Sequence, residues 1–447
     1  MLPEQAGNLP LQGTAIHKLK MHKIHLLLLL GLSTALAFGQ QSLLSDLDWN
    51  ARTIAIGLDN FKSVPLFGQD NDTDFLSVSI LRLIAQGKPK SKLKYEIHAV
   101  QSFTYFNLRA GAGSPGIELS ANGVRYQAID AATDWIEEEH FTANLLIDRF
   151  NLKLELPSSD VTLGRQAITF GKAYFWNPLD IFSPFDPRQF DRDYKAGVDA
   201  LRVDHPLGDF SGLNIVGALG REIEASGRFV GGKSTWHHSF YGSVILGRAF
   251  TNWKGWDLAV QGGKVYGGYQ IGGATTGEFG PLAFRFETAY LFVYDSPPLS
   301  FGLPGELVED NFQAVVGIGH RFESSLQLEA EYFYNGAGEV DQFETALIRQ
   351  STGGSLNLSR QLAGFFSSYE ILPILVGQMA AMVSLSDGSL QVQPSLRLSV
   401  SDETDLLIGL VINMGDRPNG VTPVSPGLRS EFGSQPNFIY AELKVYF

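Results

Sequence analysis

The chain has 447 residues, more acidic than basic side chains and no cysteine. Its formal net charge of −13 at pH 7 makes nucleic acid an unfavourable partner. The lack of cysteine excludes thiolate catalysis, disulfide bonds and cysteine-based metal sites. Beyond the N-terminal segment, no apolar run approaches the ~20 residues of a transmembrane helix, so any membrane insertion must use β-strands.

The N-terminal segment has the three-part composition of a secretory signal peptide. Lys18, Lys20 and Lys23 precede an apolar run over residues 24–37, and small residues lie at 35, 37 and 39. The run is too short for a membrane anchor, which favours a cleaved signal. We therefore predict an N-terminal extension and signal peptide at 1–39 and a mature domain at 40–447. A compact signal begins at residue 21, so residues 1–20 are interpreted as an overextended gene start.

The mature sequence alternates between apolar and polar residues with a period of two. Residues 92–99 read Lys-Leu-Lys-Tyr-Glu-Ile-His-Ala, and residues 326–332 and 390–400 show the same alternation. This period predicts strands with one face in apolar surroundings and the other in water. A soluble sandwich would give the same alternation, so strand length and the pattern of connections must separate the two classes.

The connections favour a transmembrane barrel. We predict eighteen strands, at approximately 52–60, 75–86, 92–106, 141–156, 161–170, 198–206, 212–221, 237–249, 257–267, 268–277, 282–294, 311–322, 326–335, 361–371, 374–385, 390–400, 404–413 and 437–447. Short turns at 87–91, 157–160, 252–256, 277–281, 323–325 and 401–403 alternate with connections that are mostly long, including 107–140, 171–197, 295–310, 336–360 and 414–436.

Short turns at one end and long loops at the other predict an all-β, transmembrane, antiparallel up-and-down β-barrel with periplasmic termini. The strand count depends on the hairpin near Gly267 and on the split at Pro373. Loss of one of these two hairpins would leave a barrel of sixteen strands. Either number encloses an aqueous lumen. About a dozen residues separate residue 39 from the first strand, too few for a plug domain, so passive passage is the expected default.

The segment 171–197 is too apolar for a loop that lies in water. Its aromatic residues are Tyr174, Phe175, Trp176, Phe182, Phe185, Phe190 and Tyr194, and prolines at 178, 184 and 187 reduce the entropy lost on ordering. We expect it to fold into the lumen and narrow the pore. Its charged side chains would then face Arg165 and Arg202 across the channel and set up a transverse field.

The predicted constriction residues are Arg165, Gln166, Lys172, Trp176, Asn177, Asp180, Asp186, Arg188, Asp199 and Arg202. The alternative is a purely structural loop, in which the aromatic residues only pack and Arg165 and Asp199 only tie adjacent strands.

Two parts of the chain resemble known outer-membrane barrels. The C-terminal strand, with Ile439, Leu443, Val445 and Phe447 on one face, resembles the C-terminal assembly signal of Gram-negative barrels. This implies the barrel-assembly machinery as a partner during biogenesis and the bacterial outer membrane as location. The Gly164-Arg165-Gln166 strand, the Asn177-Pro178-Leu179-Asp180 loop and the returning Asp199-Ala200-Leu201-Arg202 strand resemble a family of porin-like barrels related to alginate-export barrels. The acidic balance of this chain argues against alginate itself.

Candidate enzymatic and metal sites are weak. Residues 137–140 (Glu-Glu-Glu-His) and the pair at 237–238 (His-His) have no identifiable partner serine, so we predict no catalytic residue, metal or cofactor. The predicted function is an outer-membrane channel for small hydrophilic solutes. Two alternatives stay open: a specific exporter or importer of a polysaccharide or hydrophobic compound, and a structural barrel. Outer-membrane lipid and small solutes are the expected partners, and a homo-oligomer stays open because no residue identifies its interface.

Overall fold

The computed structural model describes residues 47–59, 73–107, 125–182, 185–188, 193–223, 236–294, 309–341, 357–419 and 427–447. The predicted signal peptide lies outside these residues, as do the predicted loop residues Pro184, Phe190, Asp191 and Arg192. Within the described part of the chain, no helix is long and apolar enough to cross a membrane.

Nineteen strands make up one antiparallel sheet in the described residues. The strands are β1 (Leu47–Asp59), β2 (Thr73–Lys90), β3 (Leu93–Phe106), β4 (Ala132–Glu138), β5 (Phe141–Glu155), β6 (Asp160–Gln166), β7 (Val198–Pro206), β8 (Gly212–Ile223), β9 (Trp236–Trp253), β10 (Trp256–Val265), β11 (Gly268–Phe279), β12 (Leu282–Val293), β13 (Asn311–Arg321), β14 (Gln327–Asn335), β15 (Gln361–Leu372), β16 (Leu375–Ser384), β17 (Leu390–Ser401), β18 (Thr404–Met414) and β19 (Asn437–Tyr446).

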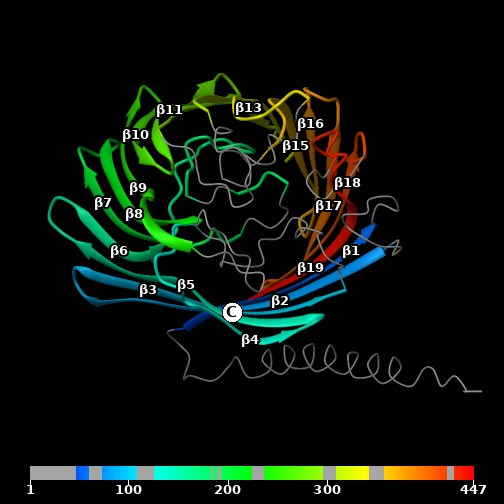
Figure 1. Cartoon of the computed structure of the whole chain (residues 1–447), viewed down its shortest axis with the longest axis horizontal. Coiled ribbons are helices and arrows are strands. Elements are labelled where there is room, and N and C mark those ends of the chain that lie inside the picture. The colour runs from blue at the N-terminus through cyan, green and yellow to red at the C-terminus, as the bar shows by residue number, and fades with distance from the viewer. Residues whose placement is uncertain are drawn as a thin grey trace, which may run out of the picture.

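The sheet closes into a barrel because β19 pairs with both β18 and β1 (Figure 1). All strands except β4 follow one another around the ring, which confirms the predicted eighteen-strand antiparallel barrel. The hairpins on which the count depends are both present. Gly267, at φ 66°, makes the two-residue turn between β10 and β11, and Pro373 lies in the turn between β15 and β16.

The outer face of the barrel is apolar along its strands. On β17, for example, Leu396 is 50% exposed, whereas the residue before it, Ser395, points to the lumen. Exposed leucine, isoleucine and phenylalanine side chains recur in the same outward register on β5, β11 and β15. Such a continuous apolar wall is unfavourable in water and indicates contact with lipid.

The inner face carries more apolar side chains than expected for a wall that faces only water. On β1, Asn50 points inward to the inner loop defined below, and Ile54, Ile56 and Leu58 share its face by alternation. They belong to a buried cluster that also takes residues from β2, β3, β18 and β19. Two further buried clusters join the inner faces of β7–β10 and β13–β16 to the segment that follows β6. The half of the lumen nearer the long connections, called the upper half here, is therefore packed over much of its circumference.

Two sequence-based boundaries were wrong near β6. The strand predicted at 161–170 ends at Gln166, because the chain leaves the wall there and enters the lumen. The predicted loop 107–140 contains β4, which pairs with residues 141–146 of β5. Since β6 pairs only with residues 150–155 of β5, the upper edge of β5 would otherwise lack a partner strand.

A charge on the outer face should destabilise the barrel more than a charge one residue away on the inner face. We expect Leu396→Lys to lower the free energy of unfolding by about 2–4 kcal/mol, because the ammonium would lie in hydrocarbon. Ser395→Lys, which points into the lumen, should cost much less. Urea unfolding in lipid bilayers, followed by tryptophan fluorescence, measures both. Equal effects of the two substitutions would contradict the assignment of faces.

Candidate functional site

The segment between β6 and β7, residues 167–197, is called here the inner loop. Its first half is held by side chains from three successive strands. Arg248 of β9 donates to the carbonyl oxygen of Phe170 (2.8 Å), Gln261 of β10 to that of Leu179 (2.9 Å), and Gln270 of β11 to that of Pro178 (3.1 Å). The inner loop thus follows the inner wall, where side chains of the strands satisfy its backbone carbonyls.

Two carboxylates from more distant strands accept hydrogen bonds from the inner loop backbone. Glu287 of β12 accepts from the amides of Lys172 (2.9 Å) and Leu179 (2.7 Å). Glu331 of β14 accepts from the amides of Tyr174 and Phe175. Both carboxylates are buried. Each accepts from two backbone donors of the inner loop, so their removal would leave amides without their acceptor, of which those of Phe175 and Leu179 belong to buried residues.

Aromatic packing fixes the same part of the inner loop. The ring of Trp176 stacks on Phe333 of β14 with centroids 5.4 Å apart, and its indole N–H donates to Asn357 (2.9 Å). Phe175 packs against Gly364 of β15, where an added Cβ would lie 2.7 Å from the ring. Glycine at this position therefore lets the phenyl ring lie directly against the strand.

The second half of the inner loop returns along the remaining strands. Gln393 of β17 donates to the carbonyl oxygen of Arg188 (3.1 Å), Lys444 of β19 pairs with Asp193 (2.5 Å), and Asn50 of β1 donates to the hydroxyl of Tyr194 (2.6 Å). The contacts of the two halves together run around most of the inner circumference. Figure 1 shows the described parts of the inner loop inside the ring of strands.

Charged groups of the inner loop pair mainly with each other. The ammonium of Lys195 lies 2.5 Å from the carboxylate of Asp180 and also donates to the carbonyl oxygen of Ile168 (2.6 Å). Burial raises the pKa of Asp180 and lowers the pKa of Lys195, and the ion pair opposes both shifts. Arg188 pairs with Asp186 two residues away (2.5 Å). Lys195 thus ties the end of the inner loop to Ile168 at its start and to Asp180 near its middle. The pair of Asp186 and Arg188 is local.

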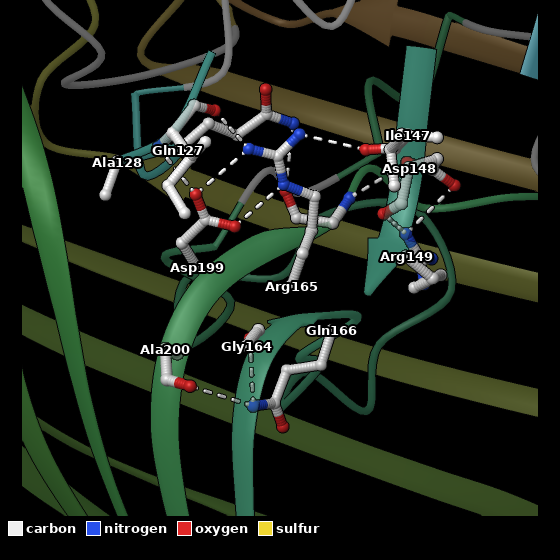
Figure 2. A network of polar contacts seen from close by, with 12 residues as sticks. Gln127, Ala128, Ile147, Asp148, Arg149, Gly164, Arg165, Gln166, Asp199 and Ala200 are labelled. Carbon is white, nitrogen blue, oxygen red and sulfur yellow. Dashed lines mark hydrogen bonds and ion pairs between the residues drawn. The ribbon is translucent and has the colours of Figure 1, made fainter. Parts of the chain in front are cut away.

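The Gly-Arg-Gln sequence lies where the inner loop leaves the wall (Figure 2). Gly164 has φ 116°, and an added Cβ would be 2.2 Å from the carbonyl oxygen of Phe150, so only glycine fits. Arg165 donates to both carboxylate oxygens of Asp199 (2.7 and 2.9 Å). It also donates to the carbonyl oxygens of Ile147 (2.9 Å) and Ile129. One guanidinium thereby joins β5, β6, β7 and the segment before β4.

That segment, residues 125–131, closes the wall above β6. The amide of Asp199 donates to the carbonyl oxygen of Tyr126 (2.9 Å), and the amide of Ile147 donates to that of Ala131 (2.9 Å). The side chain of Gln127 donates to the carbonyl oxygen of Gly197 (3.1 Å). Arg165 and Asp199 therefore tie adjacent parts of the wall, and Arg165 pairs with Asp199 rather than with a charge of the inner loop.

The predicted constriction residues occupy different environments. Gln166 is buried in the wall and donates to the carbonyl oxygen of Ala200 (3.1 Å), while Arg202 pairs with Asp204 on its own strand (2.8 Å). Trp176 and Asp180 are buried, Asn177, Asp186 and Arg188 are half-buried, and Lys172 is exposed. Their place along a conducting path stays a prediction.

Sequence reasoning missed Glu287, Glu331 and Asn357, which lie more than 100 residues from their partners in the inner loop. The alternation around Glu331 marks it as inward-facing, but no local pattern names the backbone amides that it accepts from. The predicted candidates at the β4–β5 turn, Glu139 and His140, are both exposed.

No protein-family model matches the chain, and no curated protein matches it. Solved structures do. OccAB1 of Acinetobacter baumannii aligns with 9% identity and a TM-score of 0.53, over 90% of this chain and 96% of that one. OccK8 (OprE) of Pseudomonas aeruginosa aligns with 10% identity and a TM-score of 0.51, over 90% and 97%. OpdK of Pseudomonas aeruginosa, solved with vanillate, aligns with 9% identity and a TM-score of 0.50, over 90% and 98%. At these identities the likeness shows a shared fold.

Removing Arg165 should weaken the wall far more than removing Arg202. Arg165→Met leaves the carboxylate of Asp199, whose side chain is only 13% exposed, without its cation, so we expect a loss of about 3–5 kcal/mol in unfolding free energy. Arg202→Met breaks a partly exposed pair and should cost less than about 1 kcal/mol. Urea unfolding in bilayers compares them. A small effect at Arg165 would show that the segment 125–131 closes the wall without it.

Removing Glu331 should loosen the inner loop while leaving the barrel intact. In Glu331→Ala the amides of Tyr174 and Phe175 lose their acceptor, so their hydrogen exchange should become at least about tenfold faster, the factor for ~1.4 kcal/mol of protection. Glu323→Ala, in the exposed β13–β14 turn, is the matched control. Hydrogen exchange followed by mass spectrometry resolves the peptide around residue 174. Unchanged exchange there would mean that aromatic packing alone holds the loop.

Proposed function

We propose that the protein is a channel of the bacterial outer membrane through which small hydrophilic solutes diffuse passively. The observation that carries the proposal is a closed eighteen-strand barrel with an apolar outer wall and a long segment along its inner wall. A barrel of this size is wide enough for an aqueous path. The solved structures that share its fold are those of outer-membrane porin-like channels, which supports the same use here.

The inner loop is the proposed constriction. Its anchors on Glu287 and Glu331 give it a fixed position, as a selective element needs. Lys172 is exposed, and Asn177, Asp186 and Arg188 are half-buried, so these four are the proposed contacts of a passing solute. Arg165, Gln166, Trp176, Asp180, Asp199 and Arg202 are proposed to act through the position they give to the loop and the wall.

The proposed location and biogenesis rest on the two ends of the chain. The apolar face of β19 and its aromatic end support recognition by the barrel-assembly machinery, and Phe447 stacks on Trp49 of β1 at 3.8 Å where the barrel closes. The proposed signal peptide at 1–39 and the proposed kinship with alginate-export barrels rest on sequence alone.

Transport of a hydrophobic compound is the second candidate. It is favoured by the inward-facing apolar cluster of Ile54, Ile56, Leu58, Leu76 and Val78 on β1 and β2. These side chains are at most 1% exposed, so this candidate requires that the packing over the cluster opens for the compound to pass. Ion conductance separates the two candidates, because a path for hydrophobic compounds does not require a continuous column of water.

Single-channel recording of the mature protein in a planar bilayer tests the first candidate. We expect stable conducting steps. The double variant Glu287→Ala/Glu331→Ala should conduct more, and with more noise, because the inner loop loses its anchors on β12 and β14. Glu323→Ala is the control and should conduct like the unmodified protein. Silence from protein shown to be folded and inserted would contradict the channel and favour the second candidate.

A further inference from the structure

The charge of the inner loop is balanced although the whole chain is strongly acidic. Residues 171–197 contain four basic and four acidic side chains, against a formal net charge of −13 for the chain. Among those described, Asp180 pairs with Lys195 and Asp186 with Arg188 inside the loop, while Asp193 pairs with Lys444 of β19. Lys172 is the exposed exception. Paired charges this close cancel one another's field over the width of a solute.

Some charged side chains of the wall near the inner loop are also paired with each other, whereas Glu287, Glu331 and Arg248 are hydrogen-bonded to the backbone of the loop. Arg285 of β12 donates to Glu329 of β14 (2.6 Å), and Arg82 of β2 lies 2.5 Å from Asp148 of β5. An ion that enters beside such pairs leaves its hydration shell and gains little electrostatic compensation. A neutral solute does not meet this cost.

Below the inner loop, toward the short turns, one side of the inner wall carries a row of neutral hydrogen-bonding side chains. Gln327, Ser368, Gln378 and Ser395 are direct register neighbours on β14, β15, β16 and β17. All four are half-buried, and their neighbours in sequence point outward, as Met379 does with 47% exposure. Gln327 also donates to the carboxylate of Glu329 (3.0 Å). The row therefore presents amides and hydroxyls on the lumen face, groups that both donate and accept hydrogen bonds.

An aromatic pair lies next to this row, on the side of the inner loop. Phe366 of β15, two residues before Ser368 and on the same face, lies with its ring centroid 4.8 Å from that of Tyr174 in the inner loop. Both rings are half-buried. An apolar ring face beside a row of amides and hydroxyls matches a molecule that has both C–H faces and hydroxyl edges.

From this arrangement we infer that the channel prefers neutral polyhydroxylated solutes, of the chemical class of sugars and polyols, over ions of similar size. The inference rests on the proposed channel function and names its substrate class. The charge-balanced inner loop disfavours ions of either sign. The row of Gln327, Ser368, Gln378 and Ser395, directly beside the proposed constriction, replaces water that the hydroxyl groups lose there.

Liposome swelling tests the inference with three solutes that share one carbon skeleton. Glucose is neutral, gluconate carries a negative charge and glucosamine carries a positive charge. We expect glucose to enter fastest, by about fivefold over both ions, which corresponds to ~1 kcal/mol. Ion conductance of the same preparation in planar bilayers is recorded in parallel. Conductance with equal or faster entry of gluconate or glucosamine would overturn the inference alone, whereas silence in both assays would overturn the channel itself.

Two substitutions of Gln378 locate the preference. Gln378→Leu removes one hydrogen-bonding partner and should slow glucose about fivefold, the effect of one hydrogen bond of ~1 kcal/mol. Met379→Leu, the outward-facing neighbour, should leave glucose entry unchanged. Gln378→Glu keeps the size of the side chain, adds a charge to the neutral row and should shift the reversal potential toward cations. An unchanged reversal potential in folded Gln378→Glu would place the row away from the path and overturn the assignment.

Discussion

A backbone buried inside a barrel must find hydrogen-bond partners away from the ladder of strands, and this constraint organises the molecule. The described residues of the inner loop are not paired with any strand, so the wall supplies side chains instead. Arg248 and Gln261 donate to its carbonyl oxygens, and Glu287 and Glu331 accept from its amides. Charged and amide side chains on the inner wall therefore have a structural use before any use in transport.

The same constraint explains the break in the wall. When the chain turns inward after Gln166, the upper part of β5 loses the strand that would pair with it. β4 takes that edge, and the segment before it is joined to β7 through Arg165 and Asp199. An inward loop at this point thus requires a second segment that completes the wall, and the Gly-Arg-Gln sequence lies where the two meet.

Much of the barrel could be predicted from sequence, because its cause is local. Alternation along each strand and the contrast between short and long connections depend on neighbouring residues, and they yield the eighteen strands. β4 was missed because its end, Glu137 and Glu138, runs into Glu139 and His140 and looks like part of a solvated loop; it becomes a strand only by pairing with β5. Aromatic content marked residues 171–197 as a segment that avoids water. The partners of that segment could not be predicted, because Glu331 and Phe175 meet through the closure of the ring.

The absence of cysteine makes one direct measurement simple. The central claim is that the inner loop lies against the inner face of β15, so cysteines at Tyr174 and Phe366, whose rings are 4.8 Å apart, should be joined by a short bifunctional reagent in protein inserted in a bilayer. Cysteines at Thr104 and Thr142, register partners on β3 and β5, give the reference reaction of a permanent contact. The account predicts comparable cross-linking of both pairs. Cross-linking of the reference pair without that of Tyr174 and Phe366 would contradict it.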